Sequence, residues 1–481
     1  MSAPFVIPDF APAMPEIVLL VLACVVLLVD VHQPPDRRAV TYWLTQAALL
    51  ITGFYVLKSY DTDSMVTFSG SFKLDALAVV LKLAIIGVSV SVLAYSRDYL
   101  EARGLMKGEY FLLALFAVLG MFVLVSASSM LTVYLGLELL SLSLYAMVAM
   151  DRESGEASEA AMKFFVLGAL ASGMLLYGMS MTYGATGSLD IQEIARASAG
   201  LADNKILILG TVFVVVGIAF KLGAVPFHMW IPDVYQGAPS SVTLFIATAP
   251  KLAGFAMLIR LLAEGLGGVH QHWQDMLVLM AVLSMVIGNL VAIAQTNIKR
   301  MLAYSTIAHS GFLFLGMIPG TTSGYSTALF YSVAYTLTAL GAFGLIVVLS
   351  RKGFDVEKIS DFAGLNQRSP WYALILLVLM LSMAGVPPFV GFWAKWNVLR
   401  EVIAIDMTWL ALVAVFFSII GLFYYLRVVR MAYFEASDDD TPVTLRRSVR
   451  VLLSINMLSV VLLGLVPGSL MALCAEAFST L

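Results

Sequence analysis

Five lysines lie inside the hydrophobic runs of this sequence, where a charged side chain is costly. They are Lys82, Lys163, Lys221, Lys251 and Lys395. A charged residue at the centre of a bilayer costs about 2.5–3.5 kcal/mol on insertion scales, so each of them must face protein, water or a partner. A buried lysine also holds its proton less tightly than a lysine in water, so its amine can exchange a proton near neutrality. These residue types therefore indicate proton transfer within a membrane.

One carboxylate, Glu138 in the sequence YLGLELLSLSLYAM, lies near the middle of a hydrophobic run. The other candidates, Asp30, Asp75 and Glu159, lie at the ends of their runs. A lone buried carboxylic acid stays protonated, whereas a neighbouring lysine allows it to ionise. The protonation of Glu138 is then coupled to that of its partner.

Two histidines add candidate relay groups. His228 and His309 lie in the hydrophobic runs, and an imidazole can pass protons near neutral pH. A structural histidine with its hydrogen bonds satisfied is the competing interpretation for both. For His309 the neighbouring Ser305 and Ser310 are the predicted hydrogen-bonding partners in that case.

Two of the lysines have alternative interpretations that involve no chemistry. Lys163 lies within two turns of the end of its run, so its side chain could extend to the lipid headgroups. For Lys82 we predict a structural ion pair or a headgroup contact.

The composition places these residues in a polytopic membrane protein. The chain is 60% hydrophobic and 12% charged, with a mean hydropathy of +0.93, which excludes an ordinary soluble domain. We predict an all-α protein with about fourteen transmembrane helices, at about 15–31, 40–57, 75–95, 109–126, 129–150, 159–183, 205–231, 240–262, 274–294, 300–318, 325–350, 370–402, 406–433 and 448–466. The intervening loops are too short for a nucleotide-binding domain, and no phosphate loop or metal-ligand spacing is present. The sequence thus predicts no cofactor and no metal in this chain.

The distribution of Lys and Arg predicts the orientation. One set of alternate loops carries 17 of the 28 basic residues and the other set carries six. By the positive-inside rule the first set is cytoplasmic, and both termini lie on the opposite side.

Two of the predicted spans carry similar interruptions. KLGAVPFHMWIPDVYQGAP, residues 221–239, and AGVPPFVGFWAKW, residues 384–396, both place Gly, Val-Pro, Phe and Trp in the same order, with a lysine close by. We predict that the seventh and twelfth helices are discontinuous and that Pro226 leaves a carbonyl near residues 222 and 223 without its donor. The alternative is that the prolines only kink two continuous helices.

The two interrupted spans are five apart and therefore run in opposite directions, as in inverted repeats whose discontinuous helices meet at the midplane. We predict N-terminal helices 1–3 over 1–108, a first five-helix repeat (helices 4–8) over 109–262, an inverted second repeat (helices 9–13) over 274–434, and helix 14 within 435–481.

Together these motifs resemble the antiporter-like membrane subunits of the proton-pumping NADH:quinone oxidoreductase, respiratory complex I. The sequences that carry the resemblance are WIPDVYQGAP, APKLAGF, YLGLELLSLSLYAM, EAAMKFFVLG and GFWAKW, and it covers nearly the whole chain. Lys395 differs from the glutamate that is usual in subunit M, and the chain lacks the long lateral helix of subunit L. The DVYQGAP sequence most closely resembles that of one branch of these subunits.

The resemblance implies a role in proton translocation for Glu138, Lys163, Lys221, His228, Lys251, His309 and Lys395, with Lys163 as the partner of Glu138. It implies that protons move from the cytoplasm to the opposite side, driven by electron transfer from NADH to quinone in partner subunits. FMN and iron–sulfur clusters are expected in those partners. The expected partners are other complex I membrane subunits, including antiporter-like neighbours, and the hydrophilic redox arm. The expected location is the bacterial cell inner membrane.

Two other hypotheses remain open. A subunit of a multisubunit cation/proton antiporter would share the lysines and the broken helices, although DVYQGAP favours complex I. A structural membrane subunit that conducts no protons would not explain five lysines inside the spans.

Overall fold

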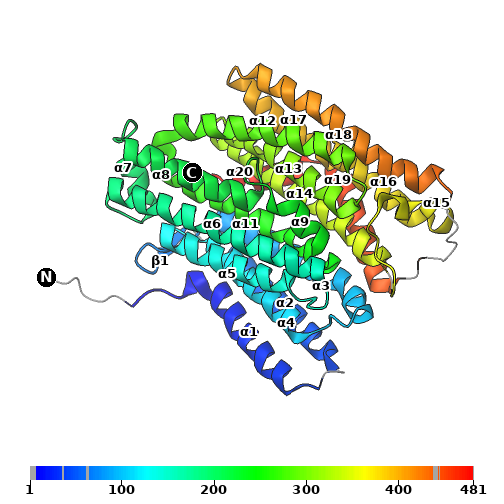
Figure 1. Ribbon diagram of the computed structural model, residues 1–481. Helices are drawn as coiled ribbons and strands as arrows, with labels where there is room; N and C mark the ends of the chain where they lie inside the picture. The colour runs from blue at the N-terminus through cyan, green and yellow to red at the C-terminus, as the bar shows by residue number, and fades with distance from the viewer. Residues whose placement is uncertain are drawn as a thin grey trace.

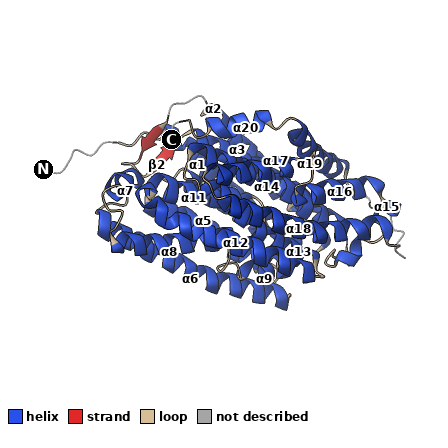
Figure 2. Cartoon of the chain, turned by 90° about the horizontal axis from the view of Figure 1, so that it is seen from above, coloured by secondary structure: helices blue, strands red, loops and turns tan. Residues whose placement is uncertain are grey.

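The computed structural model describes residues 7–34, 37–60, 64–350, 352–436, 443 and 445–479, and these form a helical bundle (Figure 1). Arg351, one of the basic residues counted for the orientation, lies outside the described residues. The described chain is helical almost throughout, with one short antiparallel hairpin of β1 (Met65–Thr67) and β2 (Phe72–Leu74) (Figure 2). The predicted all-α fold is confirmed.

All fourteen predicted spans correspond to helices. The long continuous ones are α1 (Met14–His32), α2 (Ala39–Lys58), α3 (Ala76–Ala102), α4 (Gly108–Val125), α5 (Met130–Val148), α6 (Gly155–Thr186), α12 (His270–Ala294), α13 (Ile298–Met317), α14 (Thr322–Leu349), α18 (Thr408–Phe434) and α19 (Arg447–Leu465). The interrupted ones are α8 (Lys205–Leu222) with α9 (Trp230–Gly237), α10 (Ser240–Ile246) with α11 (Ala249–Leu258), and α16 (Pro370–Ala384) with α17 (Val390–Ala404). Within the described residues, twelve helical segments are long and apolar enough to cross a membrane; α13 and the α16–α17 pair complete the set.

Short elements lie in the connections, where the sequence predicted only loops. They are the hairpin, α7 (Ile191–Ser198), α15 (Leu365–Arg368), α20 (Gly468–Glu476) and the 3₁₀ turns Ala11–Ala13, Gly267–Val269 and Ile359–Phe362. Because these elements are short, they show no long hydrophobic periodicity from which they could be predicted.

Both predicted breaks are present and share one local geometry. α8 ends at Leu222, Gly223 adopts φ +75°, and Val225-Pro226 is a cis peptide. α16 ends at Ala384, Gly385 adopts φ +83°, and Pro387-Pro388 is cis. A positive φ is readily adopted by glycine, which has no Cβ. The alternative of two continuous kinked helices is thereby excluded.

The eighth span differs from its prediction as one continuous helix over 240–262. α10 ends at Ile246 and α11 begins at Ala249, because Thr248 adopts φ −119° and ψ −93° and Pro250 lies in the first turn of the new helix. A π-helix from Ile259 to Gly265 follows α11. The whole apolar window of this span is buried, so it forms the centre of the bundle.

Candidate functional site

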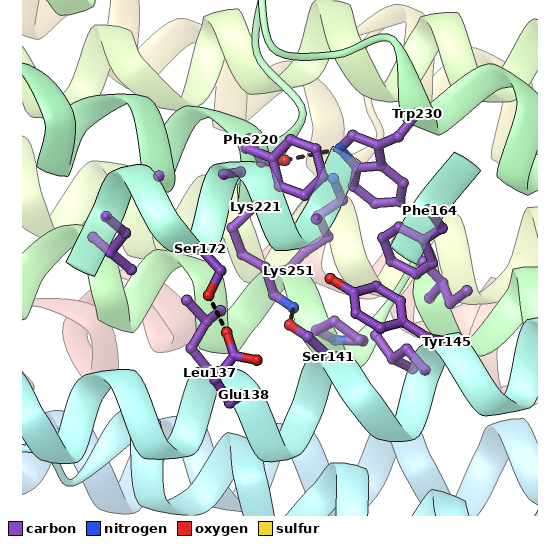
Figure 3. Close-up of a pocket in the computed structure, with 17 residues that line it drawn as sticks. Leu137, Glu138, Ser141, Tyr145, Phe164, Ser172, Phe220, Lys221, Trp230 and Lys251 are labelled. Atoms are coloured by element: carbon purple, nitrogen blue, oxygen red, sulfur yellow. Dashed lines mark hydrogen bonds between the residues drawn. The ribbon is translucent and has the colours of Figure 1, made fainter. Parts of the chain in front are cut away.

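A cavity of about 30 Å³ lies beside the break that follows α8 (Figure 3). Its polar lining comes from Glu138 and Ser141 on α5, Ser172 on α6, Lys221 on α8 and Lys251 on α11. A cavity of this volume has room for about two water molecules, and its polar lining supplies their partners. Three of the predicted site residues thus share one small polar cavity.

Within this cavity, Glu138 and Lys221 face each other from α5 and α8. The hydroxyl of Ser172 donates a hydrogen bond to Oε1 of Glu138. Nζ of Lys221 donates to Oγ of Ser141, one turn along α5 from Glu138, at 3.4 Å. The carboxylate attracts the ammonium electrostatically across the cavity. Lys221 is therefore a lysine that lines the same cavity as Glu138, and each of the two side chains is held by a serine.

Lys251 binds the carbonyl that the break leaves unpaired. Its Nζ donates to the carbonyl of Leu222 at 2.9 Å, and Oγ of Ser310 donates to the same oxygen at 2.7 Å. Pro226 cannot donate to this carbonyl because it has no N–H group. The predicted free carbonyl is confirmed at Leu222, and side chains from α11 and α13 supply its donors.

His309, which directly precedes Ser310 in α13, lies among tyrosine side chains. Its Nδ1 lies 2.6 Å from Oη of Tyr331, and its Nε2 lies 3.1 Å from Oη of Tyr425. The alternative in which Ser305 and Ser310 satisfy His309 is excluded, because Ser305 bonds to Tyr425 and Ser310 to the Leu222 carbonyl. Serines four residues and one residue away could be named from the sequence, whereas tyrosines on α14 and α18 could not.

At the second break Lys395 repeats the arrangement of Lys251. Its Nζ donates to the carbonyl of Ala384, the last residue of α16, at 2.9 Å, and to Oγ of Ser418 at 2.7 Å. A cavity of about 10 Å³ beside it is lined by both Lys395 and His309. Ser310 contacts the first break, and the adjacent His309 lines the cavity beside the second. Helix α13 therefore connects the two breaks.

Lys163 is not paired with Glu138, and this expectation is corrected. Its Nζ forms ion pairs of 2.8 Å with Glu159 and with Asp233 on α9, and its side chain is 43% exposed. Arg300 of α13 binds the other oxygen of Asp233 at 2.7 Å. Partial burial alone would raise the pKa of Asp233, but the hydrogen bonds from Lys163 and Arg300 outweigh it and lower that pKa below its usual value.

His228 lies in the turn between α8 and α9. It is not among the described residues that line the cavities around Lys221 and Lys395. The structure therefore does not bring it together with the other candidates.

Two buried charge clusters lie away from both breaks. Lys82 on α3 is fully buried and pairs with Glu16 on α1 at 2.6 Å, so its predicted structural pair is confirmed. Arg260 is fully buried and donates to both carboxylate oxygens of Asp75 at 2.8 Å, and it also pairs with Glu264. Arg260 is one of the six basic residues that the orientation count placed in the second set of loops, whereas the structure buries it. No group of three or more metal-ligating side chains occurs in the described ranges.

The comparisons with known proteins give the family. Residues 127–421 match the family described as NADH:quinone oxidoreductase/Mrp antiporter, TM. The chain belongs to this family. It is 55% identical over 477 residues to NADH-quinone oxidoreductase subunit N of Thioalkalivibrio sulfidiphilus, which covers 99% of each chain, and 56% identical to subunit N of Alkalilimnicola ehrlichii over 98% of each.

Solved structures of the NADH:quinone oxidoreductase/Mrp antiporter family have the same fold. A chain of respiratory complex I from Thermus thermophilus matches with a TM-score of 0.84 and 31% identity, over 96% of this chain and 100% of that one. A chain of the Mrp complex from Dietzia sp. matches with a TM-score of 0.84 at 18% identity, over 98% of this chain and 97% of that one, which shows the shared fold alone.

Proposed function

We propose that this chain is a proton-translocating membrane subunit of NADH-quinone oxidoreductase. The observation that carries the proposal is that each helix break holds a lysine ammonium on its last carbonyl, Lys251 on Leu222 and Lys395 on Ala384. An amine fixed beside polar space can gain and lose a proton without moving far. The relatives named subunit N, matched over nearly the whole chain, support the assignment to this enzyme.

The proposed route begins at Glu138 and Lys221, continues to Lys251, and passes α13 at Ser310 and His309 to Lys395. Ser310 and His309 are adjacent residues of α13, and every other neighbouring pair shares a cavity or a hydrogen-bonding partner. Glu138, Lys221 and Lys251 line the same cavity, where opposite charges attract each other and like charges repel each other. A change in the charge of Glu138 therefore alters how strongly Lys221 holds its proton, which favours transfer onward to Lys251.

Lys163 and His228 take different places in this proposal. Lys163, with Asp233 and Arg300, forms a charged cluster beside the first turn of α9, where it can exchange protons with the adjoining solution. His228 is kept as a candidate relay in the turn between α8 and α9.

We propose that protons move from the cytoplasm to the opposite face of a bacterial inner membrane, with both termini on that opposite face. The greater number of Lys and Arg residues in one set of loops supports this orientation. The two breaks, with their glycines and prolines in matching positions, support two inverted repeats over 109–262 and 274–434, flanked by helices 1–3 and helix 14.

Free energy must come from partner subunits in this proposal. Moving one charge against a potential of about 150 mV costs about 3.5 kcal/mol. The FMN and iron–sulfur clusters that pass electrons from NADH to quinone would lie in the hydrophilic arm. Other membrane subunits would transmit the free energy of this electron transfer to the present chain. An antiporter subunit is the alternative, because the family and the fold include Mrp proteins.

The test uses the whole enzyme complex reconstituted in vesicles. Replacing Lys251 with Ala is expected to reduce NADH-driven proton pumping about tenfold or more. Lys205→Ala, an exposed lysine at the start of α8, is the matched control and should pump normally. Normal pumping by an assembled Lys251→Ala complex would contradict the proposal. Proton flux driven by a sodium or potassium gradient in the absence of NADH would instead favour the antiporter.

A further inference from the structure

A surface cavity of about 370 Å³ lies between α14, α17 and α20. Hydroxyl groups from the first turns of α14 line one side of it, and Asn397 and Arg400 of α17 line the other. The hydroxyls belong to Thr322, Ser323, Ser326 and Thr327. Such a lining supplies both donors and acceptors to water. The cavity lies outside the route from Glu138 to Lys395 described above.

The same two helices also enclose the small cavity beside Lys395. Its lining includes Tyr331 and Thr338 of α14 and Lys395 of α17. On α14, Phe330 lines the surface cavity and the adjacent Tyr331 lines the inner one. On α17, Lys395 and Asn397 are two residues apart, a rise of about 3 Å. The two cavities therefore follow one another along the α14–α17 seam.

A buried carboxylate lies behind the outer cavity. Glu401 is only 7% exposed and lies one helical turn beyond Asn397. Its Oε1 accepts hydrogen bonds from Oγ of Ser323 at 2.9 Å and from Arg400 at 3.3 Å. Since Ser323 and Arg400 both line the surface cavity, they connect Glu401 to it. The seam thus places a protonatable group between the buried lysine and the protein surface.

We propose that the α14–α17 seam is the proton release path, with Glu401 as the acceptor that follows Lys395. This inference rests on the proposed proton-translocating function. The proton leaves Nζ of Lys395, which becomes a neutral amine, and crosses about 9 Å of helix rise past Asn397 through water. It then binds the Glu401 carboxylate. Glu401 passes it to water in the surface cavity and returns to its ionised form, and no electron is transferred.

The first test replaces Glu401 with Gln in the complete complex. Gln keeps an oxygen that can accept from Ser323 but cannot carry the proton, so we expect NADH-driven pumping to fall about tenfold or more. Glu401→Asp should recover part of the rate and move its pH profile, which a structural role alone would not do. Glu476→Gln, an exposed carboxylate on α20, is the matched control and should pump normally.

A second test compares one assembled variant before and after chemical labelling. Ser326→Cys is made with Cys24 and Cys474 replaced by Ala, and the assembled complex is then treated with a charged, membrane-impermeant thiol reagent from the non-cytoplasmic side. We expect labelling to reduce pumping. The same labelling of Ala202→Cys, exposed elsewhere, should leave pumping unchanged.

The outcomes of these tests distinguish the proposed release path from the proposed proton-translocating function. If Glu401→Gln and labelled Ser326→Cys both pump at the parent rate while Lys251→Ala is blocked, the release path is wrong and the proposed function stands. If Lys251→Ala and Lys395→Ala also pump at the parent rate, the function fails and the release path fails with it.

Discussion

Lys251 donates a hydrogen bond of 2.9 Å to the carbonyl of Leu222, the last residue of α8 before its break. Lys395 donates to Ala384, the last residue of α16, at the same distance. In each case the ammonium lies at the carbonyl end of a helix, which favours a positive charge. Because these amines come from different helices, α11 and α17, the shared feature is the break itself and the acceptor that it exposes.

Glu138→Ala is expected to reduce NADH-driven proton pumping without preventing assembly of the complex. The substitution removes the negative charge that stabilises a proton on Lys221. Glu138→Asp should be milder, because the charge remains. Pumping rates in vesicles, compared at equal amounts of assembled complex, check both expectations. Full pumping by Glu138→Ala would exclude this carboxylate from the mechanism.

The ion pairs of Asp233 predict a pH-dependent contribution to stability. Since its pKa is lowered, the ionised form stabilises the protein above the usual carboxyl pKa of about 4, and this contribution disappears as the pH falls through the lowered value. Thermal unfolding of the parent complex and of Asp233→Asn should therefore differ by a constant amount between about pH 5 and pH 8. A difference that vanished within this range would show that the carboxylate is not held in its ion pairs.

Lys82 is expected to act in stability rather than in proton transfer. Lys82→Met leaves Glu16 buried without its partner, and breaking a buried pair costs about 3–5 kcal/mol. The double substitution Lys82→Met with Glu16→Leu should recover most of this loss, as measured by the yield of assembled complex and its melting temperature. Pumping per assembled complex should stay unchanged in the double variant. If the double variant assembled fully but did not pump protons, the Lys82–Glu16 pair would belong to the proton route.

Gly136→Ala tests the close packing of α4 against α5. A Cβ at this position would lie 2.6 Å from the backbone nitrogen of Leu124, so the two helices would have to separate. We expect a loss of about 1–3 kcal/mol and a lower yield of assembled complex. Gly173→Ala on α6 is the matched control, because a Cβ there meets nothing within 4 Å. Equal yields from both variants would contradict the packing.

The sequence predicted the features that depend on local chemistry. Hydrophobic runs gave the fourteen spans, and the Gly and Pro residues around Leu222 and Ala384 gave the two breaks. Partners across helices were not predictable, because they depend on how distant helices pack. Lys163 pairs with Asp233, 70 residues away, and His309 with Tyr425, 116 residues away.

Lys251→Arg tests the central claim most directly. Arginine keeps the positive charge and can still donate to the Leu222 carbonyl, but its guanidinium does not release a proton near neutral pH. The measurement is the rate of NADH-driven proton uptake into vesicles that contain the assembled complex. We expect that rate to fall about tenfold or more. Proton uptake at the parent rate would show that the amine of Lys251 does not carry the proton.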